Sequence, residues 1–226
     1  MSLRKQCLSE LLGTYLLVFI GPASVIIAFS SSGLTPFEAQ EIVAAVFGCT
    51  VAGVMILLGR VSAQINPAVT VAKTAAGRLR QEHILPQILS QLAGAILAGV
   101  TLTIVFGRLG SANSLGSTEL ASAVSPFEGI TLEILGTFVL AMSALIAGAF
   151  LNAHYQQGIL VGTTLFILIS FIGPLTGASF NPARSLGPSL FSGYLDNQVI
   201  YYAGPILGGL AAGLIFGTVV KPQKGG

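Results

Sequence analysis

The chain has 226 residues, of which 53% are hydrophobic and only 8% are charged, and its mean hydropathy is +0.86. Soluble domains carry about 25% charged residues, so this composition excludes an ordinary soluble domain and indicates a polytopic membrane protein. The formal net charge of +2 says little by itself, and the distribution of the charges along the chain says more.

Six apolar stretches predict membrane-spanning helices, which take roughly 20 apolar residues each. They cover residues 8–29, 37–58, 84–106, 130–150, 158–172 and 199–220. The fifth stretch is short and ends against Gly173-Pro174. The first stretch lacks a small-residue cleavage site, so we interpret it as a span and not as a signal peptide.

Two shorter helices are predicted at the tripeptide Asn-Pro-Ala, which occurs at residues 66–68 and again at 181–183. Asn is a good N-cap, and Pro is favoured at the first position of a helix. The first helix ends in the polar run 73–80 and the second at residues 192–193, so both are too short to cross a bilayer. The two copies lie 181 − 66 = 115 residues apart in a chain of 226, which indicates a duplicated unit.

Both halves of the chain follow the order span, span, half-helix, span. Residues 10–15, Glu-Leu-Leu-Gly-Thr-Tyr, resemble residues 133–138, Glu-Ile-Leu-Gly-Thr-Phe. Because each repeat contains an odd number of spans, the second repeat enters from the opposite side of the membrane and forms an inverted repeat. We predict a single transmembrane channel domain over residues 1–226, with repeat one at about 7–106 and repeat two at about 130–220.

Lys and Arg predict the orientation of the chain, because basic residues concentrate on the cytoplasmic side. Eight of the ten fall on the side of the two termini: Arg4, Lys5, Arg60, Lys73, Arg78, Arg80, Lys221 and Lys224. We therefore expect a multi-pass protein of the cell (plasma) membrane with both termini in the cytoplasm. Residues 107–126, rich in Ser and Gly, form the longest predicted outer loop.

The two half-helices are expected to enter the membrane from opposite sides and to meet near its midplane. Non-helical backbone at that depth is tolerated only where it is buried in protein or lines a water-filled cavity. Each helix N-terminus is worth about half a positive charge, so two facing N-termini form a barrier to cations. Asn66 and Asn181 can each offer an amide N–H, an arrangement that suits a neutral solute able to donate and accept hydrogen bonds.

The paired Asn-Pro-Ala motifs, together with residues 10–14, 66–70 and 181–185, resemble the aquaporin (major intrinsic protein) family, in particular its archaeal and other prokaryotic members. The resemblance covers about Cys7 to Val220. It implies an all-α membrane protein with six transmembrane helices, two re-entrant half-helices and a homotetramer with a separate pore in each subunit. It also implies that Asn66 and Asn181 line the midpoint of the pore, with a narrower filter on the outer side.

The family's spacing implies that the filter consists of Arg184, Ala178, Ile169 and Phe47. An arginine within the membrane is costly and by default functional; a structural ion pair is the alternative for Arg184, and lipid contact or core packing is the alternative for Phe47. Ile169 stands where water-selective members carry His, and Ala178 is small, so we expect a wider and more apolar constriction than in a strict water channel. Ser185, however, replaces the Asp of glycerol facilitators.

Glu10 and Glu133 are acidic residues deep within predicted spans. One interpretation is a proton or cation relay; the family resemblance implies the other, in which each carboxylate accepts hydrogen bonds from the backbone of a re-entrant loop. His83 and His154 have no metal-ligand neighbours at suitable spacing. Since no phosphate loop or nucleic-acid patch is found either, we expect no cofactor, no metal and no nucleic-acid partner.

We predict a passive channel, not an enzyme, that conducts water and excludes protons and ions. Glycerol, other small neutral solutes and dissolved gases are secondary permeants, and membrane lipid surrounds the protein. Three alternatives stay open. One is a facilitator whose main solute is glycerol, and another is a scaffold with a vestigial pore. The third is an ion-coupled secondary transporter, since transporters also use inverted repeats and broken helices.

Overall fold

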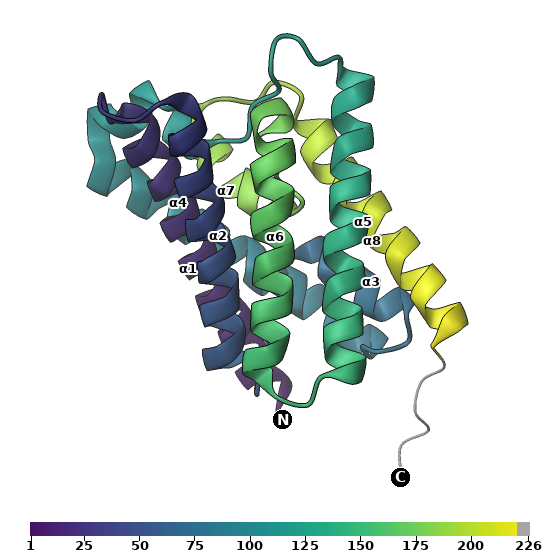
Figure 1. Ribbon diagram of the computed structural model, residues 1–226. Helices are drawn as coiled ribbons and strands as arrows, with labels where there is room; N and C mark the ends of the chain where they lie inside the picture. Colours follow the sequence, from purple (N-terminus) through teal and green to yellow (C-terminus); the bar gives the residue numbers. More distant parts are fainter. Residues whose placement is uncertain (221–226) are drawn as a thin grey trace.

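The computed structural model describes residues 1–220, which form an all-helical bundle without strands (Figure 1). Within this range, six long apolar helices are able to cross a membrane: α1 (Leu3–Ser30), α2 (Pro36–Leu58), α4 (Gln81–Ala112), α5 (Pro126–Phe150), α6 (His154–Thr176) and α8 (Gln198–Val219). Two short helices, α3 (Pro67–Ala75) and α7 (Pro182–Ser192), lie between them, and a 3-10 turn, η1, covers Ser114–Gly116. The predicted fold class is thereby confirmed. Lys221 and Lys224, part of the charge pattern above, lie outside the described residues.

Helices α4 and α6 continue past the C-terminal ends that their apolar stretches predict. The backbone of α4 breaks at Gly107 (φ 47°, ψ −122°) and then resumes helical geometry to Ala112, so the first part of the predicted outer loop is helical. A positive φ is accessible to glycine because it lacks a Cβ atom. Helix α6 passes Pro174 and ends at a left-handed cap on Gly177 (φ 74°), because a proline removes one helical donor without preventing another short stretch of helix.

Helices α2 and α5 begin with the same chemical device on the face opposite the N-terminus (Figure 1). The Glu38 carboxylate accepts a hydrogen bond from the Thr35 backbone N–H at 2.8 Å, while the Glu38 N–H donates to the Thr35 hydroxyl at 3.3 Å. Ser125 and Glu128 repeat both contacts at 2.8 and 3.3 Å. These capping boxes satisfy donors that would otherwise be orphaned at a helix start, and so fix where each span begins.

Close approach between helices depends on small residues. A Cβ atom on Gly208 would lie 2.2 Å from the carbonyl oxygen of Ile134 in α5, and one on Gly209 would lie 2.4 Å from that of Ala68 in α3. Glycine at both positions therefore lets α8 pack against a long helix and a half-helix at once. More widely, α1 packs on α4, α5 on α8, and α2 on α6.

Each half-helix packs against the half of the chain to which it does not belong. Helix α3 packs mainly on α8, and α7 packs mainly on α4, so each half-helix rests on the last long helix of the other half. In Figure 1, α7 lies in the upper and α3 in the lower part of the bundle. This exchange brings the two Asn-Pro-Ala segments together in the middle of the protein.

Candidate pore

Asn66 and Asn181 cap the two half-helices at their N-termini. The Oδ1 atom of Asn66 accepts a hydrogen bond from the Ala68 backbone N–H at 2.8 Å, and the Oδ1 atom of Asn181 accepts one from Ala183 at 3.0 Å. Both asparagines have an extended backbone, as an N-cap requires, and the proline that follows starts the helix. The capping oxygen points into the helix, so the amide nitrogen of each side chain points away from it.

Each amide nitrogen reaches the opposite loop. Asn66 Nδ2 donates to the Phe180 carbonyl oxygen at 2.8 Å, and Asn181 Nδ2 donates to the Ile65 carbonyl oxygen at 2.9 Å. Ile65 (φ 46°) and Phe180 (φ 50°) both adopt left-handed backbone geometry, which bulky residues rarely do. The reciprocal bonds hold the two strained loops together. An amide group carries two N–H donors, so each asparagine retains one for a solute.

Glu10 supports the first loop from behind. Its carboxylate accepts hydrogen bonds from the backbone N–H groups of Gln64 at 2.8 Å and Ile65 at 2.6 Å. It also accepts bonds from the Ser62 hydroxyl and, at 2.7 Å, from the Gln91 side-chain amide. The carboxyl group is fully buried. All of these partners are donors, which is the environment that an acceptor-only carboxylate needs when it is buried.

Glu133 supports the second loop in the same way as Glu10 supports the first. Its carboxylate accepts hydrogen bonds from the backbone N–H groups of Ser179 at 2.9 Å and Phe180 at 2.8 Å, and from the Thr176 hydroxyl at 2.7 Å. Each glutamate therefore binds the two residues that directly precede an Asn-Pro-Ala asparagine. The two loops have matching frameworks although their sequences differ.

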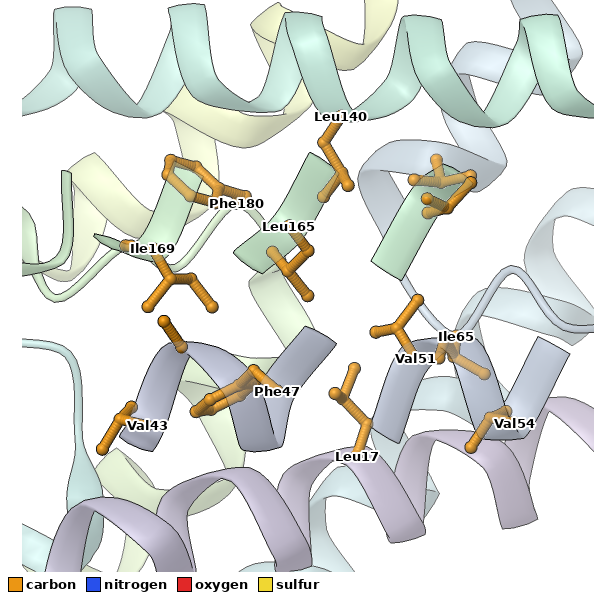
Figure 2. Packing of buried hydrophobic residues seen from close by; sticks show 14 of the residues in the cluster. Leu17, Val43, Phe47, Val51, Val54, Ile65, Leu140, Leu165, Ile169 and Phe180 are labelled. Atoms are coloured by element: carbon orange, nitrogen blue, oxygen red, sulfur yellow. The ribbon is translucent and has the colours of Figure 1, made fainter. Parts of the chain in front are cut away.

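A cavity runs beside both asparagines and offers about 70 Å³ to the centres of water molecules. One water needs roughly 10–15 Å³ of such space, so the cavity holds several in a row. Figure 2 shows Leu17, Val51, Leu140 and Leu165 pointing from four helices toward this space. Its wall is thus largely apolar, with isolated polar groups. Such a wall offers few groups to which a passing water molecule could form a hydrogen bond.

The predicted filter residues lie together at one end of this cavity. Phe47, Ile169, Ala178 and Arg184 line it, and the same four residues line a second cavity that opens beyond them. Their side chains are only 2–3% exposed. The four residues therefore lie where the inner cavity adjoins the second cavity.

Arg184 is held by neutral groups. Its Nη1 atom donates to the Gly116 carbonyl oxygen at 2.9 Å, and its guanidinium carbon lies 4.9 Å from the centre of the Phe47 ring, within the range of a cation–π contact. Among residues 1–220 it forms no ion pair, so the structural ion pair considered as an alternative is not observed. Its buried Nε atom has no hydrogen-bond partner among the described residues. Phe47, for its part, faces Arg184 and not lipid.

Two groups that the sequence did not indicate hold the predicted filter residues in place. Gly116, in η1, supplies the carbonyl oxygen that holds Arg184, and Gln40 Nε2 in α2 donates to the Ile169 carbonyl oxygen in α6 at 2.8 Å. A glutamine within an apolar span is a signal that could have marked Gln40. No spacing rule singles out Gly116, because the contact depends on how the outer loop folds back over α7.

Lys73 lies on the wall of the inner cavity, together with Met55, Gly148 and Gln157. The charge pattern predicts only its side of the membrane, so this position on the cavity wall is a new observation. Met55 lies eight residues beyond Phe47 on α2, which corresponds to about 12 Å of helix, so these residues mark the end of the cavity away from Arg184.

The model of the major intrinsic protein family matches residues 1–216. This chain belongs to the major intrinsic protein family. Membership makes it a passive transmembrane channel for water and small solutes, not an enzyme.

Major intrinsic proteins of distant organisms resemble the chain to a similar degree. Aquaporin NIP1-1 of Arabidopsis thaliana is 32% identical over 97% of this chain and 75% of its own length. Aquaporin AqpM of Methanothermobacter marburgensis is 30% identical over 95% of this chain and 97% of its own. The X-ray structure of the aquaglyceroporin from Plasmodium falciparum has a TM-score of 0.82, covers 96% of this chain and 95% of its own, and is 20% identical. That last likeness shows the fold alone.

Proposed function

We propose that water is the principal permeant and that it follows the cavity from Arg184 past Asn66 and Asn181 to Lys73. The observation that carries this proposal is that Phe47, Ile169, Ala178 and Arg184 line both cavities. We propose that these four residues form a constriction between an outer vestibule and the inner cavity. A water molecule that enters between these four residues loses most of its hydrogen bonds to other water molecules. Water then passes the guanidinium group of Arg184 and the remaining amide N–H of each asparagine, because all three residues line the cavity.

Protons and cations are excluded by the charges around this path. The N-termini of α3 and α7 face the midpoint, and each is worth about half a positive charge. Arg184 adds a full charge at the constriction. A neutral solute keeps hydrogen bonds through the passage, whereas a cation meets the positive charges of Arg184 and of the half-helix N-termini. Among the described residues, no carboxylate lines the inner cavity.

Glycerol and other small neutral solutes are proposed as secondary permeants. Ile169 and Ala178 contribute apolar surface to the constriction, and neither side chain can donate a hydrogen bond. Such a wall tolerates the carbon skeleton of a polyol better than a histidine would. A facilitator whose main solute is glycerol is therefore the second candidate function. The ratio of glycerol flux to water flux distinguishes it from a water channel.

An ion-coupled transporter is disfavoured by the position of the buried acids. Glu10 and Glu133 do not line either cavity, and their oxygens are occupied by loop backbone and neighbouring side chains. Coupling needs a carboxylate that a cation can reach. We propose instead that both glutamates hold the re-entrant loops in place.

For the assembly and location, we propose a homotetramer in the plasma membrane with cytoplasmic termini. Family membership supports the tetramer. Arg4, Lys5, Arg60, Arg78 and Arg80 are grouped near the start of α1, the end of α2 and the start of α4, which supports a cytoplasmic face there (Figure 1). Cross-linking of the purified protein tests the tetramer, and protease access in sealed vesicles tests the orientation.

The domain organisation is proposed to be a single unit with repeats at about 7–106 and 130–220. The packing of α3 on α8 and of α7 on α4 supports this proposal, because each repeat holds the half-helix of the other. We expect the two repeats expressed as separate chains to be inactive alone and to recover water flux when they are expressed together.

Stopped-flow light scattering of proteoliposomes tests the choice of solute. Vesicles are shrunk with sucrose, which reports water efflux, and then with glycerol, which reports re-swelling as glycerol enters. We expect fast shrinkage relative to protein-free vesicles and slower but measurable glycerol entry. Glycerol entry as fast as water efflux would favour the facilitator.

A further inference from the structure

Lys73 lies on the face of α3 that lines the inner cavity. Asn66, Val69 and Lys73 follow one another at helical spacings of three and four residues, which places them on a common face, and all three line the cavity. Lys73 is seven residues from Asn66, so its backbone lies about 10 Å further along the path, away from Arg184. The ammonium group thus belongs to the opposite end of the cavity.

The Lys73 ammonium group has no fixed partner. Within residues 1–220 it forms no hydrogen bond and no ion pair. No carboxylate lines the cavity. Glu10 is close enough to interact electrostatically, but its oxygens are already bonded to the first loop. The positive charge of Lys73 is therefore left without a neutralising contact on the path.

Space for this side chain exists across the cavity. Gly148 in α5 lines the same end, and a Cβ atom built on it would meet no atom within 4 Å. Gln157, also on the wall, donates its amide to the Leu151 carbonyl oxygen at 2.7 Å and so leaves its own oxygen available to water or to the ammonium group.

A lysine in the last turn of a helix also interacts favourably with the helix dipole. A lysine in the same turn that faced the lipid headgroups would also interact favourably with the helix dipole. The helix dipole therefore does not explain why Lys73 lies on the cavity wall.

We propose that Lys73 is a second charged element of the permeation path, which repels cations at the end of the cavity remote from Arg184. The proposal rests on the path proposed above. A cation that enters from the Lys73 end meets this charge before it reaches the half-helix N-termini, whereas water passes. Lys73 and Arg184 together make both ends of the path positive, so the channel rejects cations from either side.

The test compares cation leak in channels whose first barrier has been removed. Arg184→Val, Arg184→Val with Lys73→Met, and Arg184→Val with Lys5→Met are reconstituted, and potassium current across planar bilayers is measured. Methionine keeps the length of the side chain without its charge, and exposed Lys5 provides the same charge change outside the cavity. We expect the double variant with Lys73→Met to leak on the order of tenfold more potassium than Arg184→Val alone. The double variant with Lys5→Met should leak as much as Arg184→Val alone.

The result that overturns the proposal is equal potassium leak with and without Lys73→Met. Water permeability of each variant is recorded in parallel. If wild-type vesicles shrink no faster than empty ones, the proposed path fails; if water flux is normal and leak is insensitive to Lys73, the charged barrier alone fails. Lys73→Arg in the Arg184→Val background keeps the charge. This double variant is expected to leak no more potassium than Arg184→Val alone.

A chemical version keeps the test valid should the double variant misfold. Lys73→Cys is made in an Arg184→Val background with Cys7→Ser and Cys49→Ser, and the introduced thiol is treated in the membrane with 2-aminoethyl methanethiosulfonate or with the neutral methyl reagent. We expect the amine adduct to lower potassium leak and the methyl adduct to leave it high. A thiol that reacts with neither reagent, or adducts with equal leak, overturns the assignment.

Discussion

The amide nitrogen of Asn66 donates to the carbonyl oxygen of Phe180 at 2.8 Å, across the contact between the two re-entrant loops. Asn181 returns the bond to Ile65 at 2.9 Å. Each asparagine thereby ties its own half-helix to the loop of the other half. A buried carboxylate supports each loop from behind, so the midpoint is held by a closed set of hydrogen bonds.

Removal of the Glu133 carboxylate should destabilise the protein. In Glu133→Leu the backbone N–H groups of Ser179 and Phe180 lose their acceptor, and an unsatisfied buried donor costs about 1–3 kcal/mol. We expect a lower unfolding temperature in detergent and little water flux. Glu133→Gln keeps one acceptor oxygen and should fall between Leu and wild type. An unfolding temperature for Glu133→Leu equal to that of wild type would contradict this role.

Ile169→His should shift selectivity toward water. The imidazole adds a donor and narrows the constriction, so glycerol entry should fall several-fold while water efflux falls less. Ile167→His is the matched control, because Ile167 lies on the same helix but is exposed on its outer surface. A ratio of glycerol to water flux that is the same in both variants would remove Ile169 from the filter.

Arg184→Val should admit protons and other small cations. The substitution removes a buried positive charge from the constriction, where the low dielectric constant makes it effective. We expect proton-driven dissipation of a pH gradient, detected with an entrapped fluorescent dye, at a rate at least several-fold above wild type. Arg108→Val removes an equal charge from an exposed site and should change nothing. If Arg184→Val dissipated the pH gradient no faster than wild type, Arg184 would not be part of the filter.

Mercury should inhibit the wild-type channel poorly. Cys7 and Cys49 are free thiols, and neither lines the inner cavity or the outer vestibule. We expect mercuric chloride to leave water flux nearly unchanged in wild type and to reduce it strongly in Ala178→Cys, where the thiol lies at the constriction. Strong inhibition of wild type that disappears in Cys49→Ser would show that Cys49 reaches the path.

Much of the fold follows from local patterns. Apolar stretches of about 20 residues predict the spans, and the repeated Asn-Pro-Ala predicts both half-helices, because Asn caps and Pro starts a helix whatever surrounds it. The helical continuation beyond Gly107 was not predicted, because loop composition does not show how a chain resumes after a single glycine.

The site was harder to predict than the fold. Family spacing placed Arg184 and Ile169, but their supports, Gly116 and Gln40, come from other elements and have no spacing signature. The position of Lys73 on the cavity wall was not predicted either. Counting charges assigns Lys73 only to one side of the membrane, whereas the helical spacing from Asn66 through Val69 to Lys73 places it on the face that lines the cavity.

The central claim is that water passes passively along the cavity beside Asn66 and Asn181, and osmotic shrinkage of proteoliposomes tests it most directly. Vesicles with the wild-type protein, matched empty vesicles and vesicles under an imposed sodium or proton gradient are compared in the same stopped-flow measurement. We predict water permeability well above that of empty vesicles, a weak temperature dependence and no effect of either gradient. Permeability equal to that of empty vesicles, or flux that requires an ion gradient, would contradict the account.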